Sequence, residues 1–224
     1  MDWRELLYPL GYIAQVAFGL RFLQQWIESE RQHKSVVTKS FWILSLLGNS
    51  LLLIHALIQL QFHLCIIQIC NAVISWRNLN LMQDKSKQVN LLTVIYSMLG
   101  LSLFTCFLFI LQGTTSPERG VEWLRLPTWN GKITQPVSFL WHLFGICGLI
   151  LFSSRFWLQW IGAEKKQQSY LGPAFWWISI VGACCTITYA IRIQDPVNVI
   201  GPALGLIPYI RNMMLIYSAD KRTS

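Results

Sequence analysis

The stretch RFLQQWIESE at residues 21–30 returns as RFWLQWIGAE at residues 155–164. Shifted by this offset of 134 positions, the chain matches itself without a gap from residue 11 to residue 81, with eighteen identities. A bias towards apolar residues would not place these polar and small identities in register: Arg21/Arg155, Gln25/Gln159, Trp26/Trp160, Glu30/Glu164, Ser45/Ser179, Gly48/Gly182, Arg77/Arg211 and Asn78/Asn212. Such a fixed register indicates two copies of one structural unit.

The composition of the chain is that of a membrane protein. Of its 224 residues, 54% are hydrophobic and only 12% are charged, whereas soluble domains carry about 25% charged residues. The net charge of +8 could suggest a nucleic-acid partner, but most basic residues flank apolar runs instead of forming one patch. We therefore expect no nucleic-acid binding and exclude the cytosolic enzyme classes.

Apolar runs of about 20 residues predict seven transmembrane helices, since lipid offers the backbone no hydrogen-bond partners. They lie at about 7–27, 40–60, 63–82, 90–112, 138–161, 174–193 and 196–217. We expect residues 7–82 to form a first triple-helix repeat, 90–112 a linker helix, 113–137 an extracytoplasmic loop and 138–217 a second repeat. An even number of crossings separates the two repeats, so they face the same way. The predicted fold is an all-α membrane protein with a 3+1+3 arrangement of parallel repeats, as in the sugar-transporting SWEET proteins.

The basic residues predict the orientation of the chain. One set of loops and the C-terminus hold nine of them, and the other set holds five, three of which lie in the long loop. The richer set is Arg31, Lys34, Lys39, Lys85, Lys87, Lys165, Lys166, Lys221 and Arg222. The positive-inside rule therefore predicts an external N-terminus and a cytoplasmic C-terminus.

The repeated pattern RFxxQWIxxE (RFxxQWIxSE in the first copy), followed by Ser, FWxxSxxG and RN, resembles the lipid A biosynthesis N-terminal domain, a family related to the SWEET and PQ-loop membrane proteins. The resemblance covers about 11–81 and 145–215. It implies a bacterial inner-membrane protein, and in some bacteria this domain precedes the glycosyltransferase domain of lipid-A-disaccharide synthase. This sequence departs from the family where a proline is usual, at Thr38 and Gly172, and at Gly201-Pro202, where Gly-Gln is expected.

Four repeated arginines are candidates for binding a phosphate or pyrophosphate headgroup. Arg21, Arg77, Arg155 and Arg211 fall within or just inside the spans, and we expect all four towards the cytoplasmic ends. A charge inside the membrane is costly and suggests function, and the guanidinium group suits bidentate phosphate binding. The alternatives are that each arginine snorkels to the interface or pairs with Glu30 or Glu164.

Polar and aromatic residues near these arginines are candidate contacts to a sugar or headgroup. Gln25 follows Arg21 by four residues, and Gln159 follows Arg155 likewise, so each pair shares one helical face. The other candidates are Trp26, Trp160, Asn78 and Asn212. The tryptophans are alternatively anchors of the interfacial aromatic belt, and the asparagines are alternatively helix caps.

The third helices of the two repeats differ. The first carries Gln68, Asn71 and Ser75, while the second carries two glycines and two prolines. We expect Gly201 and Gly205 to allow close helix packing, and Pro202 and Pro208 to kink the helix.

We expect no catalytic residue, no metal site and no cofactor. The six cysteines all lie in predicted spans without metal-ligand spacing, and His55, His63 and His142 have no second ligand nearby. No soluble α/β region is present to bind a nucleotide sugar, so the resemblance does not by itself imply glycosyl transfer.

The sequence therefore favours a membrane protein of lipid A or lipid-linked glycan biosynthesis, with membrane lipids as its surroundings. It would bind a phosphorylated glycolipid or polyprenyl-linked sugar, and present or translocate it. Three alternatives stay open: an anchor or accessory for a membrane-associated glycosyltransferase such as the synthase, a SWEET-like facilitator of free sugars, and a direct enzymatic part in disaccharide formation.

Overall fold

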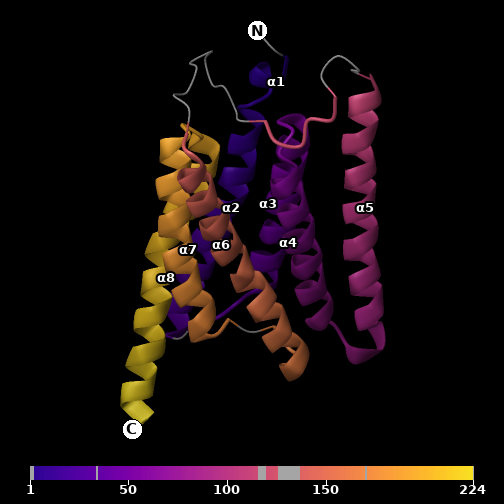
Figure 1. Ribbon diagram of the computed structural model, residues 1–224. Coiled ribbons are helices and arrows are strands. Elements are labelled where there is room, and N and C mark those ends of the chain that lie inside the picture. Colours follow the sequence, from indigo (N-terminus) through magenta and orange to yellow (C-terminus); the bar gives the residue numbers. More distant parts are fainter. Residues whose placement is uncertain (1–2, 34, 116–119, 126–136, 170, 224) are drawn as a thin grey trace.

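A computed structural model describes residues 3–33, 35–115, 120–125, 137–169 and 171–223, with side chains described as far as residue 218. The described chain is almost entirely helical (Figure 1). A four-residue α1 (Trp3–Leu6) precedes seven helices of 20 residues or more. These are α2 (Leu10–Gln32), α3 (Lys39–Ile58), α4 (Phe62–Leu81), α5 (Leu91–Thr115), α6 (Phe139–Lys166), α7 (Pro173–Arg192) and α8 (Pro196–Thr223), with a 3-10 turn η1 (Lys85–Lys87) before α5. The all-helical prediction is confirmed.

Six segments of the described chain are long and apolar enough to cross a membrane. They contain α2, α3, α5, α6, α7 and α8. The remaining predicted span, at 63–82, corresponds to α4, which has the same length as α3. It carries Gln68, Asn71, Arg77 and Asn78, all buried, and these residues lower its hydropathy. The seven-crossing arrangement stays a prediction.

The helices extend beyond some predicted ends. We expected the first span at 7–27, but α2 begins after Pro9 and continues to Gln32. Similarly, α6 continues to Lys166, although the predicted span ended at 161. A hydropathy window stops at the first charged turn, whereas the helical backbone needs no apolar residues to continue.

The backbone conformation also shows the duplication. Among the described non-glycine residues, a positive φ occurs at two pairs of positions separated by the repeat offset. His33 and Gln167 have φ of 50° and 51°, and Leu60 and Gln194 have φ of 56° and 54°. Because non-glycine residues seldom adopt this conformation, the matching pairs show that both copies turn at equivalent places.

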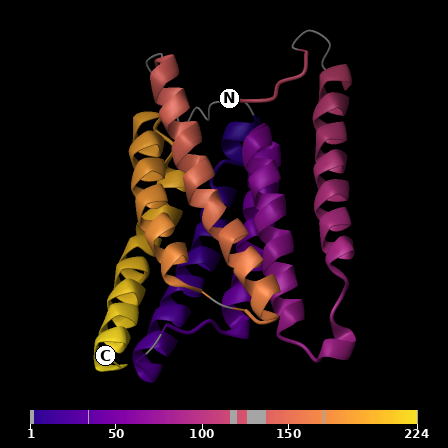
Figure 2. The same ribbon diagram turned by 60° about the horizontal axis from the view of Figure 1, so that its bottom comes forward.

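Each repeat packs as a consecutive helix triplet, with α2, α3 and α4 in one and α6, α7 and α8 in the other. The triplets meet through two equivalent seams, α2 with α8 and α4 with α6. Helix α5 packs against α4 and stands at the edge of the bundle (Figures 1 and 2). The α2–α3, α4–α5 and α6–α7 turns lie with the C-terminus at one end of the bundle, and the N-terminus lies at the opposite end (Figure 1). We call the first of these the basic end, because its turns carry Arg31, Lys39, Lys85, Lys87, Lys165 and Lys166.

Aromatic residues at the start of the second helix in each repeat fill the core. Phe41 and Trp42 have ring centroids 4.9 Å apart, as have Phe175 and Trp176, and all four are buried. Their equivalent packing fixes the start of α3 and α7 against the neighbouring helices. The starts of these helices are built differently: the Thr38 hydroxyl caps α3, and Gly172-Pro173 begins α7.

Gly182 should resist substitution, because it lies where α7 touches α6. A Cβ at this position would come 2.6 Å from the Cα of Phe152, and backbone cannot move aside as a flexible side chain can. We expect Gly182→Ala to lower the thermal midpoint in detergent, at a cost of about 1–3 kcal/mol. Gly162→Ala is the matched control, since a Cβ added there would meet no atom within 4 Å, and should leave the midpoint unchanged or higher. Equal midpoints for both variants would contradict this packing.

The described part of the loop between α5 and α6 covers the α3–α4 turn at the opposite end. Gln61 and Leu124 form an antiparallel bridge, and Phe62 N donates to the carbonyl of Trp123 at 3.1 Å. The Trp123 ring stacks on Phe109 of α5 with centroids 5.8 Å apart. Most of the predicted loop at 113–137 lies outside the described residues or, at 113–115, inside α5.

Candidate functional site

A cavity of about 80 Å³ lies where the two repeats meet. Both triplets contribute to its wall, and α5 does not. Its polar lining residues are Gln15, Arg21, Asn49, Gln68, Asn71, Ser153, Arg155, Thr186, Asn198 and Tyr209. A water molecule needs about 10–15 Å³ of such space, so the cavity suits a phosphate group together with part of a sugar ring.

Arg21 of α2 enters this cavity almost without partners. Its side chain is only 3% exposed. Nη1 donates to Ser45 Oγ at 3.1 Å, and Nε has no hydrogen-bond partner. The guanidinium carbon lies 4.2 Å from the ring centroid of Phe22, so an aromatic face provides part of its surroundings.

Arg155, the equivalent residue of α6, is likewise buried with few hydrogen-bond partners. It is 5% exposed, Nη1 donates to the carbonyl of Phe152 at 2.7 Å, and Nε has no partner. Among the described residues, no carboxylate lies within ion-pair distance of Arg21 or Arg155. A buried cation is normally paired, so the two guanidinium groups together form an unsatisfied cationic site.

The depth of these two arginines differs from our expectation. We expected them towards the cytoplasmic ends of their helices, but Arg21 lies midway along α2 and Arg155 lies in the middle part of α6. The rise of 1.5 Å per residue puts Arg21 about 16 Å from each end of α2. The difference arises because α2 and α6 continue well beyond their predicted ends.

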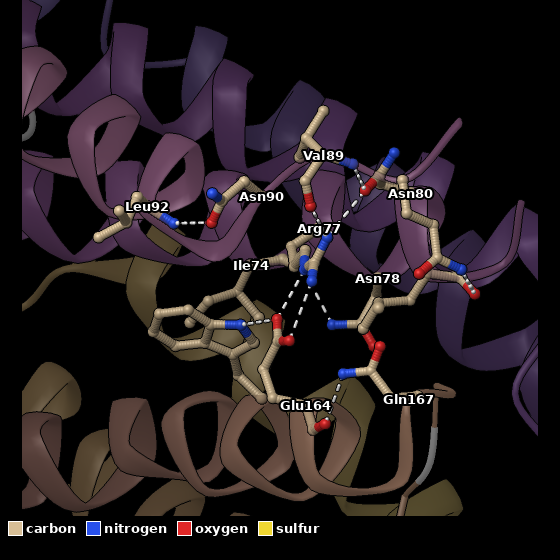
Figure 3. A network of polar contacts seen from close by, with 12 residues as sticks. Ile74, Arg77, Asn78, Asn80, Val89, Asn90, Leu92, Glu164 and Gln167 are labelled. Atoms are coloured by element: carbon tan, nitrogen blue, oxygen red, sulfur yellow. Dashed lines mark hydrogen bonds and ion pairs between the residues drawn. The ribbon is translucent and has the colours of Figure 1, made fainter. Parts of the chain in front are cut away.

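Arg77 and Arg211 do not line the cavity but form ion pairs at the basic end. Arg77 of α4 binds Glu164 of α6 in a bidentate pair, with Nε–Oε1 at 2.6 Å and Nη2–Oε2 at 2.9 Å (Figure 3). Arg211 of α8 binds Glu30 of α2 through the same atoms. Sequence reasoning named these glutamates as alternative partners. It did not show that each pair joins one repeat to the other.

The two predicted tryptophans hold these glutamates in place. Trp26 Nε1 donates to Glu30 Oε1 at 3.0 Å, and Trp160 Nε1 donates to Glu164 Oε1 at 2.9 Å. Each indole therefore orients the carboxylate that receives the arginine from the other repeat.

The predicted glutamines and asparagines form a second link beside each ion pair. Gln25 and Asn212 exchange two amide hydrogen bonds of 2.8 and 3.0 Å. Gln159 and Asn78 do the same at 2.7 and 3.0 Å. We call each ion pair with its tryptophan and amide pair a clamp. The first clamp is Arg77, Glu164, Trp160, Asn78 and Gln159, and the second is Arg211, Glu30, Trp26, Asn212 and Gln25.

Five further buried polar atoms around the cavity have no hydrogen-bond partner. They are Gln15 Oε1, Gln68 Oε1, Asn71 Oδ1, Thr186 Oγ1 and Tyr209 Oη. More than nine-tenths of buried backbone polar groups, and most buried side-chain polar atoms, are paired in native proteins. Their concentration at one cavity, together with both arginine Nε atoms, marks a polar centre of the bundle where water or a polar ligand would complete the hydrogen bonds.

The two repeats contribute differently to the cavity. Four amide side chains come from the first repeat: Gln15, Asn49, Gln68 and Asn71. The equivalent positions of the second repeat hold Leu149, Ala183, Pro202 and Gly205. We call the four amides the amide wall. The sequence drew attention to Gln68 and Asn71, but it missed Gln15 and Asn49, which a search for polar residues with apolar repeat partners would have found.

The glycines and prolines of α8 bring this helix close to the cavity. Gly201 faces Gln15 of α2, and Gly205 accommodates the hydroxyl of Tyr209. Helix α8 continues through Pro202 and Pro208 without interruption. Gly201 therefore serves close packing between the repeats.

The described residues offer no constellation for catalysis with a metal. No group of three or more His, Cys, Asp or Glu side chains is close enough to hold an ion in the described part of the chain. His142 Nδ1 lies 2.9 Å from Tyr189 Oη, and His55 packs on the ring of Tyr8. These contacts are structural, at the opposite end from the clamps.

Comparison with known proteins agrees with this duplicated architecture. The lipid A biosynthesis N-terminal domain matches the chain twice, at residues 10–80 and 144–214. Lipid-A-disaccharide synthases of Chlamydia felis and Chlamydia abortus are each 37% identical over 217 residues, and that of Chlamydia pneumoniae is 33% identical over 218 residues. These alignments cover 97% of this chain but only 34–35% of the synthases, so the chain spans about a third of their length. No solved structure matches the chain significantly. The chain therefore belongs to the lipid A biosynthesis N-terminal domain family and carries two tandem copies of its domain.

Proposed function

We propose that this protein binds the phosphorylated headgroup of a glycolipid or polyprenyl-linked sugar in the cavity between its repeats. It would act in lipid A or lipid-linked glycan biosynthesis in the bacterial inner membrane, with the basic end in the cytoplasm. The single observation that carries the proposal is the pair of buried guanidinium groups, Arg21 and Arg155, that face one cavity without a described carboxylate partner.

Phosphate is the chemical group that best complements the charge and hydrogen-bond donors of Arg21 and Arg155. A guanidinium is planar and offers parallel N–H donors, which match two oxygens of a phosphate. Bringing an anion between two buried cations also removes the cost of leaving them unpaired. A neutral sugar could not supply this compensation, which disfavours the SWEET-like facilitator of free sugars.

The amide wall supports a sugar attached to the phosphate. Gln68 and Asn71 have buried amide oxygens without a hydrogen-bond partner, and an amide oxygen accepts hydrogen bonds. Sugar hydroxyl groups are the donors that such oxygens require. The second repeat contributes a single amide, Asn198, so the ligand should lie with its phosphate between the arginines and its sugar nearer the first repeat.

Equilibrium binding in detergent tests the proposal. The probes are a short-chain glucosamine disaccharide lipid with one phosphate and the same lipid after phosphatase treatment. We expect the phosphorylated probe to bind and the treated probe to bind about 100-fold more weakly or not at all, because only the phosphate satisfies the two guanidinium groups.

Arg21→Gln should weaken binding of the phosphorylated probe about 10- to 100-fold, the contribution of a charged hydrogen bond. Arg31→Gln is the matched control, because the Arg31 side chain is 76% exposed and distant from the cavity. Equal affinity for both probes, or equal loss in the two variants, would reject the proposal.

A second function is favoured by the relatives, which carry a region like this chain within proteins named lipid-A-disaccharide synthase. The chain would then be an accessory that presents lipid to a membrane-associated glycosyltransferase. An assay of the purified protein with a labelled nucleotide sugar, alone and with such a synthase, distinguishes the roles. Stimulation of the synthase without transfer by the chain alone would favour the accessory role, and transfer by the chain alone would show an enzyme.

A further inference from the structure

We propose that the protein moves the phosphorylated headgroup across the membrane, and that the two clamps are the gate at the basic end. This inference rests on the proposed function and decides between presentation and translocation. A protein that only presented its lipid would hold the headgroup at the membrane surface, where the headgroup lies in any case. Two observations favour translocation instead. They are the position of the cavity midway along its helices and the different links between the repeats at the two ends of the bundle.

The cavity lies midway along the helices that carry its two arginines, which would place a bound headgroup between the two leaflets. Arg21 is about 16 Å from either end of its helix, which spans about 35 Å in all, and Arg155 faces the same cavity. A headgroup bound there has left the interface of its own leaflet. Binding sites at the midplane, at the interface between repeats, are the arrangement of proteins that carry polar solutes through a bilayer.

The basic end is closed by a symmetric pair of links. Each clamp joins the first helix of one repeat to the third helix of the other, by Arg77 to Glu164 and by Arg211 to Glu30. The reciprocal amide pairs lie beside them, one turn or more below the cavity arginines. Any separation of the repeats that opens the cavity to this end must break both clamps.

Among the described residues, the side-chain bonds that join the two repeats at the opposite end lie on the α2–α8 side, while Arg125 of the α5–α6 loop pairs with Glu5 and Gln59. Tyr8 Oη donates to Asp195 Oδ1 at 2.6 Å, which links the start of α2 to the start of α8. The equivalent positions on the α4–α6 side are His142 and Gln61. They are not bonded to each other, because His142 contacts Tyr189 of its own repeat and Gln61 Oε1 has no partner. The described residues of the two repeats are therefore linked across both seams at the basic end and across the α2–α8 seam at the opposite end.

Vesicles test the movement directly. The protein is reconstituted in phosphatidylethanolamine and phosphatidylglycerol with a trace of a monophosphorylated, acylated glucosamine disaccharide whose phosphate is radiolabelled. A phosphatase added outside releases label only from the outer leaflet. We expect release to stop at the outer-leaflet fraction in protein-free vesicles, and to proceed to nearly all of the label with the protein.

A reversible lock tests the gate. In Arg77→Cys/Glu164→Cys, a short reducible bifunctional thiol reagent joins the positions of one clamp. We expect the linked protein to bind the probe in detergent but to lose most of its translocation, and reduction to restore it. Each single variant, treated alike, is the matched control for reaction at the native cysteines.

The outcomes separate the two proposals. Binding in detergent without release of inner-leaflet label would overturn translocation and leave the proposed function standing. Absence of binding in detergent would remove the proposed function, and this inference with it. A linked double variant that translocates as fast as its reduced form would overturn the role of the clamps as a gate.

Discussion

Arg155→Met is expected to raise the thermal midpoint of the empty protein and to weaken binding of the phosphorylated probe about 100-fold. The gain in stability follows because the substitution removes a buried cation that has one neutral hydrogen bond and no described carboxylate partner. Replacing a buried ion pair by apolar residues of similar volume is often neutral or stabilising by about 1–4 kcal/mol, and we expect the same sign for a buried charge that has no ionic partner. Thermal unfolding in detergent and equilibrium binding are the two measurements.

The opposite signs of these effects distinguish a binding residue from a structural one. Arg155→Lys is the conservative control, because it keeps the charge but lacks the planar fork, and we expect an intermediate loss of affinity, about 10-fold. A large fall in the thermal midpoint of Arg155→Met, with unchanged affinity in the protein that remains folded, would show that Arg155 serves the fold alone.

Arg77→Leu is expected to destabilise the protein by about 2–4 kcal/mol, the cost of breaking a partly buried ion pair and leaving one charge behind. The Arg77 side chain is 5% exposed and that of Glu164 is 18% exposed. The substitution also removes the donor to Asn80 and to the carbonyl of Val89 (Figure 3). A lowered thermal midpoint, without a direct effect on the cavity, is the expected result.

Two further variants test whether the unpaired carboxylate of Glu164 causes the loss of stability in Arg77→Leu. Arg77→Leu/Glu164→Leu should recover part of the lost stability, since no charge is left unpaired. Arg211→Leu, in the equivalent clamp, should cost less, because that pair is 39% and 34% exposed and water can solvate Glu30. Equal destabilisation in the two clamps would contradict an explanation based on burial.

The sequence predicted the repeat unit because the duplication preserved residues that no composition bias would align. Arg21 with Arg155 and Gln25 with Gln159 identify equivalent positions from the amino-acid order alone. The same pairs also predicted which residues cluster, since four arginines, two glutamines, two tryptophans and two asparagines all take part in the cavity or the clamps.

The repeat could not show which copy provides each partner. Arg77 has a glutamate available in its own repeat, Glu30, and another in the second repeat, Glu164, and the two are equivalent in sequence. The structure pairs Arg77 with Glu164, because the first helix of one triplet packs on the third helix of the other. Such an exchange depends on how the triplets dock, and no local pattern carries that information.

The differences between the copies were as informative as the identities. Both copies retain the cavity arginine, whereas the amides at Gln15, Asn49, Gln68 and Asn71 occur in the first copy alone. Under the proposed function, this division would give a symmetric phosphate site with the sugar nearer the first repeat.

Native mass spectrometry of the protein purified in mild detergent tests the central claim most directly. The wild-type protein should carry a phosphorylated glycolipid, and Arg21→Gln/Arg155→Gln should lose it while remaining folded. Retention of the same lipid by the double variant, or bulk phospholipid alone on the wild-type protein, would contradict binding of a phosphorylated headgroup between Arg21 and Arg155.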